Sequence, residues 1–476
     1  MKTKIRITTA LILLLTMLAG ASAGNAAITT YSSGISVQNL EGVSATVTLS
    51  YYNPDGTLAV NPPPQIIIAA YDAVIIFPLV DPPSGFDGSM VISSTQPLSA
   101  AARITASDGT NDLAFGAAYT GFSSGAGSNF LPILYNNNWG FNTYFSVQNV
   151  GAVATDISVS YSDSTSNSAT GLQPGAAVKF DQTAESHATG WIGSGTVTST
   201  ASDIAIVGMV VKDDTAGREA MMAYNGFPSG SQEPIFPTFY ENNWDYMAGI
   251  SIQNMGTNTT TLTVDYTAST IGGTTYGTDC TEVRNVGPNK TGFFGLYVFA
   301  SDPDPDPDSL VSETCVEGEH FIGSGVVTNN STSQELAAAI NLVKFATPYK
   351  SGTYNGLDPS QGTAIVAFPM AMDRYGGYFS GFSIVNVGTS TIPMANMACV
   401  FRGIDKDSNP VVVTLQPSED ILVNGIWSTA HDGDIADGFI GSAICTATGG
   451  EIVGQGSYAN VVANGDALYA YEGFNK

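Results

Sequence analysis

The chain has 476 residues and a formal net charge of −26, although only 12% of its residues are charged. A chain this negative is a poor partner for nucleic acid or anionic lipid, because both are bound through basic patches. Gly, Ser, Thr, Asn and Tyr are abundant. This composition favours turn-rich β structure with a neutral polar surface over an acidic disordered tail.

The first element in chain order is a predicted secretory signal peptide over residues 1–23. The basic start MKTKIR precedes the apolar run ITTALILLLTMLAG and the small residues Ala21-Ser22-Ala23. We expect cleavage there, so that the mature protein begins near Gly24 or Ala27 and is secreted or held at the cell surface. No later segment reaches the roughly 18 uninterrupted apolar residues of a membrane helix, so membrane insertion is not expected.

Three sequence blocks recur four times in the same order, which indicates internal duplication. The first block, as in SVQNVG, carries an Asn at Asn39, Asn149, Asn254 and Asn386. The second block, as in WIGSGTVTS, carries a Gly at Gly88, Gly193, Gly323 and Gly441. The third block, as in AYNGF, carries a Tyr at Tyr119, Tyr224, Tyr354 and Tyr471. Each interval is the size of one small domain.

Within each repeat, apolar and polar residues alternate as in half-buried strands, and no long segment has a helical period. In the second repeat, seven such segments lie near 131–135, 144–149, 155–161, 175–181, 191–199, 203–211 and 219–225. This rhythm predicts an all-β chain of four immunoglobulin-like β-sandwich domains. The predicted domains are 28–122, 130–227, 234–357 and 363–476. The Gly/Ser/Pro linkers between them are expected to permit some bending.

The third repeat is longer than the others, and we assign the extra length to an insertion over 267–318. Four cysteines in an exported chain predict two disulfides. Three connectivities are possible among Cys280, Cys315, Cys399 and Cys445. Pairing Cys280 with Cys315 and Cys399 with Cys445 is favoured because each bridge then lies inside one repeat.

An aromatic lead-in precedes the later repeats, as in FLPILYNNNW (130–139) and IFPTFYENNW (235–244). We expect its tryptophans to pack at a sandwich end or at a junction between repeats. The alternative is that its aromatics stack on sugar rings, and the candidates are Tyr135, Trp139, Tyr240 and Trp244. The first repeat lacks most of this lead-in, so its sandwich is predicted to be one strand short and open to a strand from another molecule.

The only acidic cluster that suggests a metal is SDPDPDPDS, with Asp302, Asp304, Asp306 and Asp308. Calcium needs a loop that folds back on itself, whereas alternating prolines favour an extended segment that holds the carboxylates apart. We therefore prefer a solvated acidic spacer and keep calcium as a weak alternative. Phosphate loops, dinucleotide fingerprints and zinc-type spacings are absent from the sequence, so no cofactor is expected.

Catalytic residues are not predicted. The three histidines, His187, His320 and His431, each precede a Gly-Ser block and are expected to be polar residues of exposed loops. The Ser of that block lacks the strand-to-helix elbow of a hydrolase nucleophile. A residue that recurs in every copy favours a role in the fold, because one active site would not need four.

The order SVQNVG, an alternating VSY strand, FIGSGTVTS and AYNGF resembles tandem repeats in large secreted surface proteins of bacteria, notably filamentous Chloroflexi-type organisms. The resemblance covers nearly the whole mature chain and implies an exported β-sandwich array without catalytic residues to carry over. The fourth copy departs from the pattern, with Val385 where the others have Gln and with Cys399 in its strand.

The predicted function is a non-enzymatic surface or matrix protein with a structural or adhesive role. Its expected partners are envelope polymer, glycan, other surface proteins or a further copy of the chain. The alternatives are a carbohydrate-binding array and a subunit of an extracellular filament or surface layer.

Overall fold

The structure is a computed structural model that describes residues 9–13, 28, 30–109, 114–212, 219–271, 273–295, 309–316, 318–331, 334–346, 349–429, 433–463 and 465–476. Within these ranges the chain is all β, and every strand pairing is antiparallel. Two 3-10 turns lie wholly within the described ranges, η2 (Pro359–Gln361) and η3 (Met394–Asn396).

Repeat 2 shows the plan of the module most simply. Its strands are β9 (Ser128–Asn136), β10 (Phe141–Asn149), β11 (Thr155–Tyr161), β12 (Ser166–Leu172), β13 (Ala177–Asp181), β14 (Trp191–Ser199), β15 (Ile204–Lys212) and β16 (Ala220–Asn225). They form two four-stranded sheets, β12-β11-β14-β9, which we call the outer sheet, and β13-β10-β15-β16, which we call the inner sheet. The same names are used for the equivalent sheets of the other repeats. Both sheets contribute to one apolar core, with Ile157 and Val197 from the first and Val147 and Ile206 from the second.

Sequence periodicity predicted about seven segments here, and the structure has eight strands. The additional strand is β12, SNSATGL, whose residues are mostly exposed up to the buried Leu172. It pairs only with β11, at the edge of its sheet. Because neither face of this edge strand is mainly buried, its sequence carries no apolar alternation.

The other repeats follow the same plan. Repeat 1 has β1 (Thr9–Leu13), β2 (Thr30–Asn39), β3 (Ala45–Tyr52), β4 (Gln65–Ile68), β5 (Ala73–Ile76), β6 (Ser89–Ser94), β7 (Leu98–Ser107) and β8 (Phe115–Thr120). Repeat 4 has β28 (Ile365–Tyr375), β29 (Tyr378–Asn386), β30 (Met397–Ile404), β31 (Pro410–Leu415), β32 (Ile426–Thr429), β33 (Phe439–Ala447), β34 (Ile452–Asn460), β35 (Leu468–Glu472) and β36 (Phe474–Asn475). In repeat 4, a short pairing of β28 with β29 joins the two sheets.

In repeat 3, the extra residues form additional strands. It has β17 (Ile235–Glu241), β18 (Tyr246–Asn254), β19 (Thr260–Ala268), β20 (Thr270–Ile271), β21 (Thr274–Thr275), β22 (Cys280–Val286), β23 (Thr291–Phe294), β24 (Leu310–Glu313), β25 (Phe321–Asn329), β26 (Leu336–Lys344) and β27 (Lys350–Asn355). Within 267–318, β22 and β23 take the places of β12 and β13, since they pair with β19 and β18. The additional elements are the β20–β21 hairpin and β24, which extends the outer sheet beyond β22.

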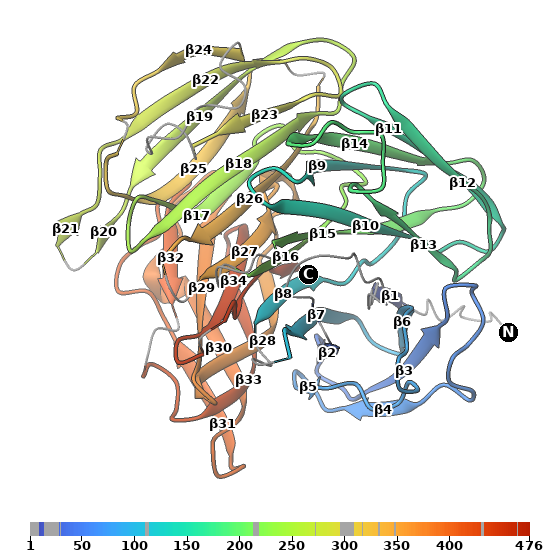
Figure 1. Cartoon of the computed structure of the whole chain (residues 1–476). Helices are drawn as coiled ribbons and strands as arrows, with labels where there is room; N and C mark the ends of the chain where they lie inside the picture. Colours follow the sequence, from blue (N-terminus) through green and yellow to red (C-terminus); the bar gives the residue numbers. More distant parts are fainter. Residues whose placement is uncertain are drawn as a thin grey trace, which may run out of the picture.

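The four sandwiches close into a ring, as Figure 1 shows from blue through green and yellow to red. The last inner-sheet strands, β8, β16, β27 and β35, lie at its centre, and each contacts the next, with β35 returning to β8. The apolar cores also run across the junctions. Ala337 and Ala339 of repeat 3 join the core of repeat 2, and Ala101 and Ala118 of repeat 1 join that of repeat 4. The repeats therefore do not bend freely about their linkers.

A closed circuit of hydrogen bonds follows the same centre. The residue after each central Tyr supplies it: Thr120, Asn225, Asn355 and Glu472. Asn225 Nδ2 donates to the Thr120 carbonyl at 3.0 Å, and Asn355 Nδ2 donates to the Asn225 carbonyl at 2.9 Å. Glu472 accepts from the Asn355 backbone N–H and, at 3.1 Å, from the Thr120 hydroxyl. Every repeat thus contributes one residue to closing the ring.

The recurring Asn of the first block fixes the fold within each repeat. Asn149 is fully buried, and its Nδ2 donates to the carbonyls of Val153 and Leu172, both at 2.8 Å. Its Oδ1 accepts from the Gly151 N–H at 3.0 Å. Asn39, Asn254 and Asn386 make the same kinds of contact. These asparagines do not have a positive φ, so the side chain, rather than a left-handed turn, explains the recurrence.

The Gln of the first block and the Gly-Ser block meet across the junctions between repeats. Gln148 Nε2 donates to Ser89 Oγ of repeat 1 at 2.6 Å, and Gln38 Nε2 donates to Ser442 Oγ of repeat 4 at 3.0 Å. Gln253 Nε2 donates to the Gly195 carbonyl of repeat 2 at 3.3 Å. Val385, which replaces the Gln in repeat 4, instead joins an apolar cluster with Ile235, Leu357 and Val453.

The recurring Gly of the second block permits close approach of neighbouring strands. An added Cβ would lie 2.1 Å from the Tyr52 carbonyl oxygen at Gly88, 2.0 Å from that of Thr267 at Gly323 and 2.1 Å from that of Arg402 at Gly441. No side chain fits at these separations, which explains the glycine.

Candidate functional site

Two exposed tryptophans lie in tight turns that connect the two sheets of a repeat. Trp139 lies between β9 and β10 and is 44% exposed, and Trp244 lies between β17 and β18 and is 57% exposed. Both have a left-handed backbone, with φ of 50° and 51°. The corresponding residue of repeat 4 is Gly376, with φ of 56°. A bulky side chain in this conformation is strained and is retained where the surroundings or the function require it.

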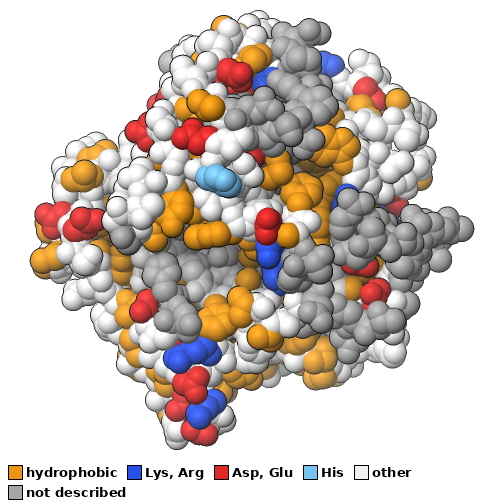
Figure 2. All heavy atoms as spheres, turned by 60° about the vertical axis from the view of Figure 1, so that its left-hand side comes forward, with side chains coloured by type: hydrophobic (Ala, Val, Ile, Leu, Met, Phe, Trp, Pro, Cys, Tyr) orange, Lys and Arg blue, Asp and Glu red, His pale blue; other side chains and the backbone are white. Residues whose placement is uncertain are grey.

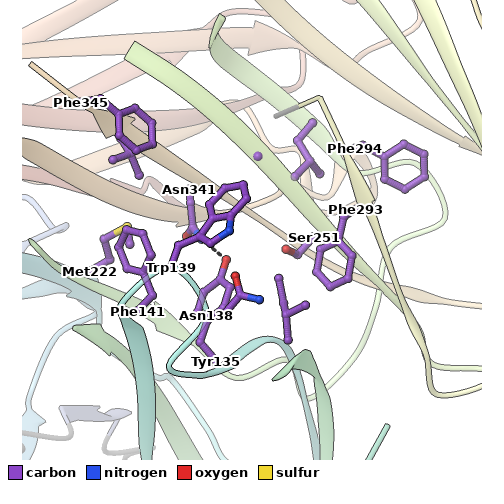
Figure 3. Close-up of a pocket in the computed structure, with 14 residues that line it drawn as sticks. Tyr135, Asn138, Trp139, Phe141, Met222, Ser251, Phe293, Phe294, Asn341 and Phe345 are labelled. Atoms are coloured by element: carbon purple, nitrogen blue, oxygen red, sulfur yellow. Dashed lines mark hydrogen bonds between the residues drawn. The ribbon is translucent and has the colours of Figure 1, made fainter. Parts of the chain in front are cut away.

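Trp139 belongs to a cleft between repeats 2 and 3. The strand before Trp139, β9, lies against the inner sheet of repeat 3, where it contacts β18 and β26. Aromatic and aliphatic side chains dominate the lining, which comprises Tyr135, Asn138, Trp139, Phe141, Ile192, Met222, Gly249, Ile250, Ser251, Phe293, Phe294, Asn341, Val343 and Phe345. Figure 3 shows Trp139 in the middle, with Phe141 and Met222 on one side and Phe293 on the other. None of these lining residues carries a formal charge at neutral pH.

Tyr135 is held in place by the neighbouring repeat. Asn341 of β26 donates to its hydroxyl at 3.0 Å, and Asn341 Oδ1 accepts from Thr353 at 2.6 Å. Burial raises the pKa of Tyr135 to about 12, and the hydrogen bond from Asn341 opposes that shift. The phenol therefore stays neutral and serves as an oriented aromatic wall.

A more polar groove adjoins the cleft at the same junction. Ile192 and Phe293 line both parts. The groove adds Ser162, Asp163 and Lys290, and Lys290 Nζ donates to the Ser162 carbonyl. Figure 2 shows one face of the molecule, on which patches of hydrophobic side chains lie among neutral polar surface and scattered charged groups. The aromatic part is narrow, with a cavity of about 40 Å³, and the polar groove is wider, at about 500 Å³.

His187 is buried beside this groove, which corrects the expectation of an exposed loop residue. Its ring stacks on Trp191 at 3.8 Å between centroids, and this stacking brings the imidazole into the sandwich. Asp163 Oδ2 lies 2.7 Å from Nδ1, and Gln182 Oε1 lies 3.0 Å from Nε2. Burial opposes ionisation of Asp163, but hydrogen bonds from Thr165 and His187 outweigh it and lower its pKa.

Both imidazole nitrogens of His187 are thus engaged, and the second faces an amide rather than a nucleophile. His320 is exposed, as expected, and contacts the Asn242 carbonyl. His431 lies outside the described residues. The buried Ser89, Ser194 and Ser442 of the Gly-Ser block lie at junctions between repeats, with Ser194 Oγ donating to the Asn289 carbonyl.

The four candidate aromatics fall into two separate groups. Tyr135 and Trp139 line the cleft. Tyr240 and Trp244 lie together elsewhere, with ring centroids 6.0 Å apart, and Trp244 also approaches Tyr276 at 6.2 Å. Both tryptophan side chains are about half exposed, and Trp244 packs against this aromatic group. Trp139 does lie at a junction.

Sequence reasoning missed the half of the cleft that repeat 3 supplies. Phe293, Asn341 and Phe345 come from β23, β26 and the residue after β26. Their positions follow ordinary strand alternation, so no local signal distinguishes them. Only the packing of one repeat on the next brings them opposite Trp139.

The cysteines pair as Cys280–Cys315 and Cys399–Cys445, each within one repeat, and the two disulfides indicate an oxidising compartment. Asp302, Asp304, Asp306 and Asp308 lie outside the described residues. Among the residues that are described, no group of three or more His, Cys, Asp or Glu side chains is placed to hold a metal ion. Over the same ranges, no helix has the length and apolarity needed to cross a membrane.

No protein-family model matches the chain, and no curated protein matches it. One solved structure with which it aligns is a glycoside hydrolase of family 32 from Bifidobacterium adolescentis. The alignment covers 92% of this chain and 98% of that chain at 9% identity, with a TM-score of 0.14. A TM-score this low carries no argument about fold or activity.

Proposed function

We propose that the protein is an exported, non-catalytic binding protein of the cell surface that holds a neutral polysaccharide in the cleft between repeats 2 and 3. The observation that carries this proposal is the place of Trp139, a half-exposed indole that lines an aromatic cleft between two repeats, which Trp244 does not. Its left-handed backbone, which Gly376 adopts without strain in repeat 4, adds to this case, because such strain is retained where the side chain has a use. The role is adhesive, attaching the protein to polymer of the surrounding matrix.

The chemistry of the cleft favours sugar rings. A pyranose presents an apolar C–H face that stacks on an aromatic ring, and Trp139, Tyr135 and Phe293 offer such rings at the cleft. Hydroxyl groups along the chain would meet the amides and hydroxyls of Asn138, Ser251 and the adjoining groove. The net charge of −26 disfavours acidic polymers, so a neutral one is favoured.

Export is supported by the signal-like start of the chain and by the two disulfides. In repeats 1 to 3, two packed sheets of four or five strands fit an immunoglobulin-like sandwich, a fold common in surface proteins. A binding role rather than catalysis is supported by His187, whose two nitrogens are occupied by Asp163 and Gln182.

The test is affinity electrophoresis of the mature chain through gels that contain soluble neutral glucans, mannans or galactans. We expect at least one polymer to retard the protein, and Trp139→Gly to weaken that binding at least tenfold, because one stacked base or ring contributes about 1–3 kcal/mol. Glycine suits the left-handed backbone, so this variant is expected to fold.

The matched control is Trp244→Gly, which removes the equivalent indole from a turn outside the cleft. It is expected to leave binding within about twofold of the wild type. Equal losses in the two variants would place binding outside the cleft. Failure of every neutral polymer to retard the wild-type protein would contradict the proposal.

A further inference from the structure

The first strand of each later repeat, which we call its lead-in strand, closes the outer sheet. β9, β17 and β28 pair with β14, β25 and β33. Each contains a proline, Pro132, Pro237 or Pro369, at a shift of register. A proline is tolerated there because a residue at a bulge need not donate a backbone hydrogen bond to the neighbouring strand.

The residue after that proline accepts a hydrogen bond from the recurring Tyr. Tyr224 donates to the Ile133 carbonyl at 2.6 Å, and Tyr354 donates to that of Thr238 at 2.7 Å. Tyr471 donates to the Met370 carbonyl at 2.5 Å. The bulge in each lead-in strand therefore satisfies a phenol that is otherwise enclosed by the core.

Repeat 1 departs from this arrangement. Its lead-in position is held by β1, which pairs with β6 from Thr9–Ser94 to Leu13–Met90. These five residues, TALIL, contain no proline and lie inside the predicted signal peptide. Tyr119 is 1% exposed, and its hydroxyl has no hydrogen-bond partner among the described residues.

We propose that the edge of β6 is an acceptor site for a strand from another surface protein. The inference rests on removal of residues 1–23, as the sequence predicts, and is independent of polysaccharide binding. The incoming strand would carry the pattern of the chain's own lead-in strands, an apolar residue, proline, any residue and then an apolar or aromatic residue. Its carbonyl after the proline would accept from Tyr119.

Two features of repeat 1 favour a strand over another kind of ligand. Without β1, the edge of β6 presents backbone N–H and C=O groups that an added strand pairs with directly. Met90 and Ile92 of β6 are fully buried in the core in the present structure, together with Tyr119. Loss of β1 removes the backbone that pairs opposite Met90 and Ile92, so an apolar strand is required to restore the sheet.

The experiment uses the chain from residue 24 and a fluorescent peptide of residues 129–136, NFLPILYN, as the probe. Fluorescence anisotropy is expected to show saturable binding that a scrambled peptide does not. Hydrogen exchange at Ser89–Ser94 should slow when the peptide is added. The Tyr119→Phe variant is expected to bind the peptide about three- to tenfold more weakly, since it loses one buried hydrogen bond.

The matched control is the same protein with residues 1–23 retained, in which β1 fills the edge and the peptide should not bind. Equal binding by both forms, or equal binding of the scrambled peptide, would overturn the proposal. So would a native N-terminus upstream of Thr9, or a stable dimer of the mature chain that excludes the peptide.

Discussion

Three junctions of the ring have a polar first-block residue, and the junction between repeats 3 and 4 has an apolar one. Gln148 meets Ser89 across its junction, whereas Val385 sits among Ile235, Leu357 and Val453 at the equivalent place. Both solutions are buried. The contrast teaches that the position is defined by enclosure between repeats, and that either a hydrogen-bonded amide or matched apolar neighbours can fill it.

A third kind of junction contains a buried carboxyl group, that of Asp466. We expect the largest effect on stability there. Asp466 of repeat 4 accepts from the Met221 N–H at 2.9 Å and from the Ser351 N–H at 2.6 Å. Burial raises its pKa to about 8, against the opposing hydrogen bonds. The folded state therefore binds a proton that the unfolded state has released above its ordinary pKa of 3.8.

This contribution to stability is complete below about pH 4 and is lost as the pH rises toward and through 8. We expect the loss to reach about 1.4 kcal/mol per pH unit between those limits. Urea unfolding at pH 5, 6, 7 and 8 should show the decline as a difference between the wild type and Asp466→Asn. Parallel curves for the two proteins would show that Asp466 titrates normally.

The next largest effect is expected at the recurring Asn of the first block, whose contacts lie within a repeat rather than between repeats. Asn149→Ala removes three hydrogen bonds from a buried side chain to backbone groups and is expected to cost about 3 kcal/mol of unfolding free energy. Asn386→Ala should cost about the same, because repeat 4 keeps this contact although it lacks the Gln. Denaturant midpoints will show whether the two losses agree.

Exchanging the two kinds of junction residue is expected to cost different amounts of unfolding free energy in the two directions. Val385→Gln places an amide among apolar side chains and is expected to cost about 2 kcal/mol. Gln148→Met is expected to cost at most about 1 kcal/mol, because the Gln148 Oε1 already lacks a partner among the described residues. Thermal unfolding of both variants tests this asymmetry, and equal costs would refute it.

The smallest effect on unfolding free energy is expected at the recurring Tyr, where repeat 1 differs from repeat 2. Tyr224→Phe loses the hydrogen bond to the Ile133 carbonyl and is expected to cost about 1 kcal/mol. Tyr119→Phe loses no such bond and should be neutral or slightly stabilising. Chemical denaturation of the pair provides the measurement, and a destabilised Tyr119→Phe would mean that its hydroxyl has an acceptor in solution.

Much of the module was readable from local pattern. Strands such as β11 alternate strictly between buried and exposed residues, so their period was visible in Ile157, Val159 and Tyr161. β12 and β24 were not visible, because exposed edge strands need no apolar face. Tyr135 and Trp139, which repeat 2 supplies to the candidate site, were predicted from the sequence. Phe293 and Asn341, which repeat 3 supplies, were missed.

By itself, the sequence determined the β class, the fourfold duplication and the recurring Asn, Gly and Tyr positions, because these depend on contacts within a repeat. Tertiary structure alone decided that the repeats form a closed ring, that Gln148 and Ser89 are partners, and that a cleft opens beside Trp139. The physical reason is that these features arise between surfaces far apart in the chain, and no periodicity records which surfaces will meet.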